Sequence, residues 1–98
     1  MKRIRLREEA RDEFLKEVAY YEERRSGTGK HFREAVNAAL HLVRRFPTGG
    51  APGPAGTRRT KVKGFPFTVF YRDEAVEIVV FAIAPDRRQT GYWAPRAR

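Results

Sequence analysis

Cysteine is absent from this 98-residue chain, and acidic residues are few. Without cysteine, the chain can form neither a disulfide framework nor a thiolate metal site, and the absence fits a reducing compartment. No apolar run approaches the roughly 20 residues that a membrane-spanning helix needs. The basic start of the chain, residues 1–10, lacks the apolar core of a signal peptide. We therefore expect a cytoplasmic protein that does not insert into a membrane.

The usual catalytic patterns are missing as well. The two histidines, His31 and His41, are ten residues apart on one predicted helix, which separates them by roughly 15 Å. The carboxylates gather near the start of the first predicted helix, where they stabilise the positive helix end. No phosphate-binding glycine loop and no metal-ligand spacing is present. We expect no metal, no cofactor and no carboxylate, metal or triad hydrolysis.

What the chain does have is positive charge. Lysine and arginine total 21 against 12 acids, a net charge of +9, and residues 24–98 hold fifteen of the bases but only five of the acids. A cationic surface of this kind favours a polyanion or an acidic protein as partner. A surface that only keeps the protein soluble is the alternative.

The apolar pattern predicts an α+β fold with the order β-α-α-β-β-β, in one domain over residues 1–98. Two helices form an antiparallel hairpin on one face of a three- or four-stranded, mostly antiparallel sheet. Gly27 is expected in the left-handed conformation between the helices, and Thr28 as the N-cap of the second. The predicted strands cover residues 2–7, 58–63, 67–72 and 76–84, the helices 8–25 and 28–46, a connecting loop 47–57, and a basic aromatic tail 86–98.

The run 76–84 is apolar on both alternating faces, which is typical of a central strand. One face holds Val76, Ile78, Val80, Ala82 and Ala84, and the other holds Val79, Phe81 and Ile83. The helical hairpin covers one face only. The second face therefore needs the tail, with Tyr92 and Trp93, or a partner chain.

Basic residues next to this strand suggest two kinds of site. Lys61, Lys63, Arg88 and Tyr92 are a possible set for metal-independent RNA cleavage, since cations stabilise the anionic phosphorus centre and a lysine or tyrosine moves protons. A binding face without chemistry is the interpretation that we favour. A non-catalytic nucleic-acid-binding module, with Tyr92 and Trp93 for stacking, stays a further alternative.

Several segments together carry a family resemblance. They are AYYEER at 19–24, the helix end Phe46-Pro47, FPFTVFYR at 65–72 and DRRQTGYWAPR at 86–96. In this order and spacing the chain resembles the ParE/RelE superfamily of toxins from bacterial type II toxin–antitoxin pairs, and in particular the ParE branch. The likeness covers nearly all of residues 2–96.

The resemblance implies a toxin that arrests growth until a cognate antitoxin, with an acidic and partly disordered C-terminal region, neutralises it. A ParE-like toxin would inhibit DNA gyrase through binding. The alternative is a RelE-like endoribonuclease that cuts messenger RNA in the ribosome. Of the RelE catalytic pattern, Lys61, Lys63 and Arg88 carry over, Tyr92 is displaced, and Thr68 or a neighbouring residue stands where an arginine is expected.

Two surfaces follow from this resemblance. The target is expected to contact the basic residues of the predicted strand 58–63 and the basic and aromatic residues of the tail. These residues are Arg59, Lys61, Lys63, Arg87, Arg88, Tyr92 and Trp93. The antitoxin is expected to contact apolar side chains of the last two strands: Phe70, Val79, Phe81 and Ile83.

Overall fold

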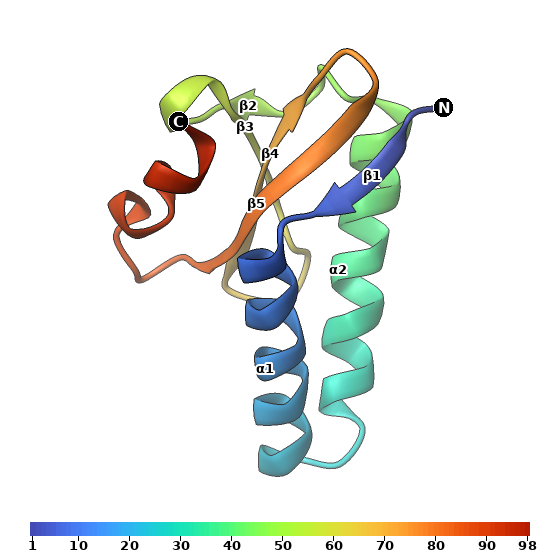
Figure 1. Cartoon of the computed structure of the whole chain (residues 1–98). Helices are drawn as coiled ribbons and strands as arrows, with labels where there is room; N and C mark the ends of the chain where they lie inside the picture. The colour runs from blue at the N-terminus through green and yellow to red at the C-terminus, as the bar shows by residue number, and fades with distance from the viewer.

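Two helices and a five-stranded sheet make up the structure, a computed structural model that describes residues 1–98 apart from the side chain of Thr90 (Figure 1). Within the described residues, no helix is long and apolar enough to cross a membrane. The elements are β1 (Arg3–Leu6), α1 (Glu8–Arg24), α2 (Thr28–Arg45), β2 (Ala51–Pro52), η1 (Pro54–Gly56), β3 (Arg58–Lys61), β4 (Phe67–Asp73), β5 (Glu77–Pro85), η2 (Thr90–Tyr92) and η3 (Ala94–Ala97).

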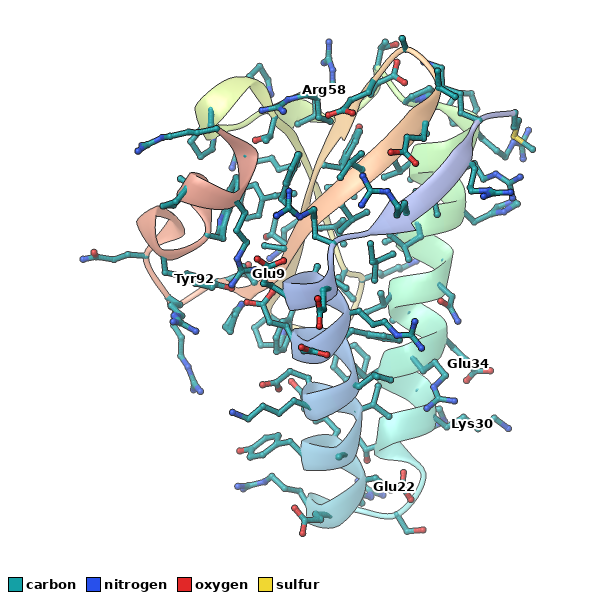
Figure 2. The ribbon with its side chains drawn as sticks, viewed as in Figure 1. Glu9, Glu22, Lys30, Glu34, Arg58 and Tyr92 are labelled. Carbon is teal, nitrogen blue, oxygen red and sulfur yellow. The ribbon has the colours of Figure 1, made fainter. Side chains whose placement is uncertain are left out.

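The helical hairpin matches its prediction to within one residue at each helix end. Gly27 connects the helices with a φ of 89°, the left-handed conformation that was expected of it. The prediction of Thr28 as N-cap was wrong, because Thr28 is already helical. The Glu22 carboxylate instead accepts hydrogen bonds from the backbone N–H groups of Gly27 and Gly29, at 3.0 and 3.1 Å (Figure 2). A negative charge therefore satisfies the positive start of α2.

The sheet has the strand order β1-β5-β4-β3-β2. It is mixed, because β1 runs parallel to β5 while the other pairs are antiparallel. The predicted α+β class with an N-terminal helical hairpin is thus confirmed, and the sheet differs from the prediction in its parallel strand and its fifth strand. The extra strand is β2, a two-residue segment in the region predicted as a loop, paired with the start of β3.

A β-bulge interrupts β5. Phe70 pairs with Ala82 and the next residue, Tyr71, pairs with Val80, so Phe81 is the extra residue on β5. The bulge changes which side chains share a face. After Phe81, Ala82 points to the same side as Phe81 instead of the opposite side. The prediction of an unbroken alternation along 76–84 was therefore wrong at this point.

Each face of the sheet has its own hydrophobic core. On the face under the helices, which we call the helix face, β5 contributes Ile78, Val80 and Ile83. On the opposite face, which we call the tail face, the C-terminal tail (residues 86–98) packs against the sheet, as the red segment in Figure 1 shows. The sequence left the tail or a partner as the cover, and the structure has the tail. The tail-face core comprises Phe70, Val79, Phe81, Ala82, Ala84, Trp93 and Ala97.

Candidate functional site

The basic residues of β3 and the turn after it are exposed, as the alternating sequence predicted. Arg59 and Lys61 point away from the helix face, and Lys63 follows the strand in the turn towards β4. The Arg59 guanidinium donates a hydrogen bond from Nε to the carbonyl oxygen of Pro52, at 3.2 Å. Arg59 is thereby held over the neighbouring strand β2, and its remaining N–H groups stay available to an anion.

Lys61 has an acidic neighbour that sequence reasoning did not connect with it. Its ammonium group forms an ion pair with Asp86, and Thr68 donates a hydrogen bond from Oγ1 to the other Asp86 oxygen at 2.7 Å. Burial alone would raise the pKa of Asp86, but the hydrogen bonds from Lys61 and Thr68 outweigh it, and the pKa lies below its ordinary value. Asp86 therefore stays ionised and offsets the charge of Lys61. The first residue of the tail is also fixed to β3 and β4.

Tyr92 is the tail residue that lies near the start of α1, where Figure 2 also labels Glu9. The Arg88 guanidinium stacks on the Tyr92 ring, 3.6 Å from the ring centre. Burial, together with the negative charge of Glu13, raises the pKa of the Tyr92 hydroxyl to about 12, although Arg96 and Arg88 oppose the shift. At neutral pH this phenol keeps its proton. Tyr92 is thus a ring that supports Arg88, and it is not suited to act as a general base.

Trp93 is part of the tail-face core. Its side chain is fully buried, and its ring centre lies 4.4 Å from that of Phe70. The indole N–H has no hydrogen-bond partner among the described groups. A target molecule cannot reach this ring while the tail is in place. The exposed residues of the tail include Arg87 and Arg88, in a segment that the buried Trp93 holds against the sheet.

Two residues that the sequence did not single out, Arg96 and Glu13, join the tail to β5. Arg96 donates from Nη2 to Glu13 at 3.0 Å and from Nη1 to the carbonyl oxygen of Phe81 at 3.1 Å. Glu13 in turn accepts a 3.4 Å hydrogen bond from the backbone N–H of Ile83. Because β1 ends before this point, these two side chains satisfy backbone groups that would otherwise be unpaired. The only sequence signal was the closing arginine of the family-like tail.

Arg72 makes a second connection to the tail. Its Nη2 donates to the carbonyl oxygens of Ala55 and Ala97, both at 2.6 Å, and its guanidinium lies over the Phe81 ring at 5.0 Å. The segment η1 and the end of the chain, which are far apart in sequence, are thereby held side by side (Figure 1). Several independent contacts thus fix the position of the tail.

The four residues predicted to contact an antitoxin are not together on one surface. Phe70, Val79 and Phe81 lie on the tail face, buried beneath Trp93. Ile83 lies on the helix face, because the bulge reverses the alternation. All four are at most 4% exposed. A partner would have to displace the tail to reach the first three.

Arg87 stands at a cleft of about 430 Å³ between α1 and the turn that joins β3 to β4. Its positive charge joins those of two arginines at the end of α1. Such a cleft suits an anionic group, whereas no cluster of three or more histidine, aspartate or glutamate side chains that could hold a metal ion occurs among the described residues. The cleft is lined by Glu17, Tyr20, Tyr21, Arg24, Arg25, Thr28, Pro66, Phe67, Pro85 and Arg87.

Comparison with known proteins agrees with this architecture. A solved structure described as "Chromosomal ParDE TA system from P. aeruginosa" superposes with a TM-score of 0.67 at 18% sequence identity, covering 87% of this chain and 96% of that chain. At this identity the likeness shows the fold alone. No curated protein sequence matches the chain. The family model for the ParE toxin of type II toxin-antitoxin systems, parDE, matches residues 4–90. The chain therefore belongs to the ParE toxin family, and an antitoxin is its implied partner.

Proposed function

We propose that this chain arrests bacterial growth by binding and inhibiting DNA gyrase in the cytoplasm, and that a cognate antitoxin neutralises it. Family membership supports the toxin role. The net charge of +9 supports both a target that carries anionic groups and an antitoxin with an acidic region. The proposal has inhibition proceed by binding alone, without a chemical step.

The observation that favours binding over RNA cleavage is the contact network around Lys61. Thr68, at or next to the position where a RelE-like nuclease would have an arginine, holds Asp86 against Lys61. That carboxylate would repel the phosphate that a nuclease must stabilise. In addition, the raised pKa of Tyr92, about 12, removes the most plausible general base at neutral pH.

We propose that the gyrase-contacting surface consists of the exposed cations of β3 and the tail. Four of these cations are exposed: Arg59, Lys63, Arg87 and Arg88. The Arg88 guanidinium stacks on the ring of Tyr92, which holds it in position. Lys61 contributes through its ion pair, which fixes the start of the tail. Trp93 is buried in the tail-face core and contributes to target binding only by holding the tail in place.

The test is to express the chain alone in bacteria and to follow DNA, RNA and protein synthesis separately, together with supercoiling by purified gyrase. We expect loss of DNA synthesis, filamentation and inhibited supercoiling. Replacing both Arg87 and Arg88 with alanine should abolish the inhibition. The control variant, with Arg33→Ala and Arg45→Ala on α2, removes the same charge from another exposed surface and should retain it.

The same experiment distinguishes the alternatives. Early loss of translation with cut messenger RNA would overturn gyrase inhibition in favour of a RelE-like nuclease. Nucleic-acid binding by the purified chain without any arrest of growth would favour the basic binding module. Normal growth together with normal supercoiling at high expression would refute the proposal altogether.

A further inference from the structure

The cleft beside Arg87, of about 430 Å³, has an aromatic wall on α1. Tyr20 and Tyr21 form this wall, with their ring centres 5.7 Å apart and their ring planes at 74°. Tyr21 is fixed in place, because its ring packs edge-on against Phe65 at 5.2 Å and Phe67 at 6.2 Å. Tyr20 is 46% exposed, and within the described part of the chain its ring contacts no aromatic ring except that of Tyr21. Part of the Tyr20 ring is therefore available to stack on a planar ligand.

The side of the cleft opposite α1 is apolar. Pro66, just before β4, and Pro85, the last residue of β5, line it together with the buried Phe67. The backbone N–H of Asp86 donates to the carbonyl oxygen of Pro66 at 2.9 Å, which joins the end of β5 to the turn before β4. Small-molecule sites in proteins have volumes of roughly 300–1,000 Å³. The cleft therefore has the size and the lining for one small ligand with a flat ring.

Three arginines also line the cleft: Arg24 and Arg25 from the end of α1 and Arg87 from the start of the tail. All three are exposed, and among the described residues none of them forms an ion pair with a carboxylate. Arg24 donates one hydrogen bond from Nη1 to the Tyr20 hydroxyl at 3.1 Å, and its guanidinium lies 5.5 Å from the centre of that ring. The other N–H groups of Arg24 remain available to bind an anion beside the aromatic wall.

The nearby acidic residues do not cancel this positive charge. The Glu22 carboxylate, labelled in Figure 2, accepts hydrogen bonds from two backbone N–H groups at the start of α2, at 3.0 and 3.1 Å. Asp86 is paired with Lys61, and Glu23 does not line the cleft. Glu17 is the one carboxylate among the lining residues that the structure describes. Three positive charges therefore face one negative charge, which favours a ligand with several negative charges.

The ring and the arginines together indicate one class of ligand. A flat aromatic ring would stack on Tyr20, and anionic groups attached to it would bind arginines from two different elements. We propose that the cleft binds a nucleoside polyphosphate, with its base against Tyr20 and its phosphates on the arginines. This site goes beyond the proposed function and does not depend on it, because it concerns a ligand of the chain alone.

The test measures the binding of ATP to the full chain by isothermal titration calorimetry at low ionic strength. Two parts of the ligand serve as controls: adenosine has the ring without the charge, and tripolyphosphate has the charge without the ring. We expect ATP to bind at least about tenfold more tightly than either part. Equal binding of ATP and tripolyphosphate would overturn the inference, because the net charge of the protein alone would then explain the binding.

Variants of Tyr20 test the stacking contact. Tyr20→Ala removes the ring, whereas Tyr20→Phe keeps the ring and removes only the hydroxyl that Arg24 contacts. We expect Tyr20→Ala to weaken ATP binding about tenfold and Tyr20→Phe to change it by less than about twofold. Far-UV circular dichroism should be the same for both variants, since this side chain is largely exposed. Equal weakening by the two substitutions would contradict the stacking contact.

A matched pair of double variants tests the arginines. Arg24→Ala with Arg25→Ala removes two charges from the cleft, and Arg33→Ala with Arg45→Ala removes the same charge from exposed residues of α2 that do not line it. We expect the first variant to weaken ATP binding at least about tenfold and the second by less than about twofold. Equal losses would overturn the inference, since they would mean that the ligand responds to the net charge and not to the cleft.

Two sources carry this chemistry in a cell: a free nucleotide and the 5′-triphosphate end of a nucleic-acid strand. Competition with ATP by a short single strand that carries a 5′-triphosphate would extend the site to strand ends, and no competition would assign it to free nucleotides. Equal competition by the same strand with a 5′-hydroxyl end would overturn the inference, because backbone phosphates would then be sufficient. All of these measurements are made without gyrase, so failure of the proposed function is seen separately.

Discussion

Replacing Trp93 with alanine is expected to destabilise the whole fold. Trp93 is the only tryptophan, and its side chain is fully buried against Phe70. Truncating a buried aromatic residue costs about 3–5 kcal/mol of unfolding free energy, because transfer energy is lost and a cavity remains. Domains of this size have a total stability of roughly 5–15 kcal/mol. Trp93→Ala should therefore remove a large part of the stability.

The measurement is urea unfolding followed by far-UV circular dichroism, which does not depend on the lost fluorophore. We expect a lower midpoint with the m-value unchanged. Tyr20→Ala is the control, since this side chain is 46% exposed, and it should change the stability by less than about 0.5 kcal/mol. Trp93→Phe should cost only about 1 kcal/mol, because it keeps most of the packing and removes an indole N–H that has no described partner.

Two results would refute the reasoning. A loss below about 1 kcal/mol for Trp93→Ala would mean that the tail does not cover the sheet in solution. Red-shifted tryptophan emission in the unmodified protein, quenched readily by iodide, would mean the same. Trp93 would then be free to contact the target, as the sequence first suggested.

Three further predictions concern the hairpin and the tail. Gly29→Ala should destabilise the protein by about 1–3 kcal/mol in thermal unfolding, because the new methyl group would lie 2.6 Å from the carbonyl oxygen of Val18; an unchanged midpoint would contradict this close approach. Arg96→Ala and Glu13→Ala should be non-additive by about 1–2 kcal/mol in a double-mutant cycle, since their side chains are only 18% and 20% exposed, and additive effects would show that the ion pair does not form. Because burial raises the pKa of Tyr92 to about 12, its neutral form favours folding, and this stability is present below about pH 10 and lost as pH rises towards 12; tyrosinate absorbance should show a late phase that Tyr92→Phe removes, and titration of all tyrosines near pH 10 would argue against it.

The helices and the principal strands were predictable because their apolar periodicity is strong. The stripe on α2 that includes Phe32, Val36 and Val43 gave that helix its bounds, and these three residues are buried as expected. It was also predictable that something covers the tail face, since a strand that is apolar on both sides must be buried on both sides. Whether the tail or a partner chain covers it was not predictable, because residues 86–98 are mostly polar and show no periodicity.

The arrangement of the predicted site residues could not be read from the sequence where a single residue changes the geometry. Phe81 and Ala82 are both apolar, so nothing in the pattern reveals that the bulge places them on the same side. As a result Ile83 was assigned to the wrong face. The contact between Lys61 and Asp86 spans 25 residues, and no local rule connects them. Truncation after Asp86 would remove Trp93 and Ala97 from the tail-face core, so it would disturb the fold as well as any contact of the tail with a target.

The order in which the chain is synthesised gives the buried Trp93 a consequence. Trp93 covers a sheet whose strands all precede it in the sequence. Because synthesis starts at the N-terminus, the tail face stays uncovered until Trp93 itself has left the ribosome. Arg87 and Arg88 are made before Trp93, but they take their final positions only once Trp93 has packed against the sheet.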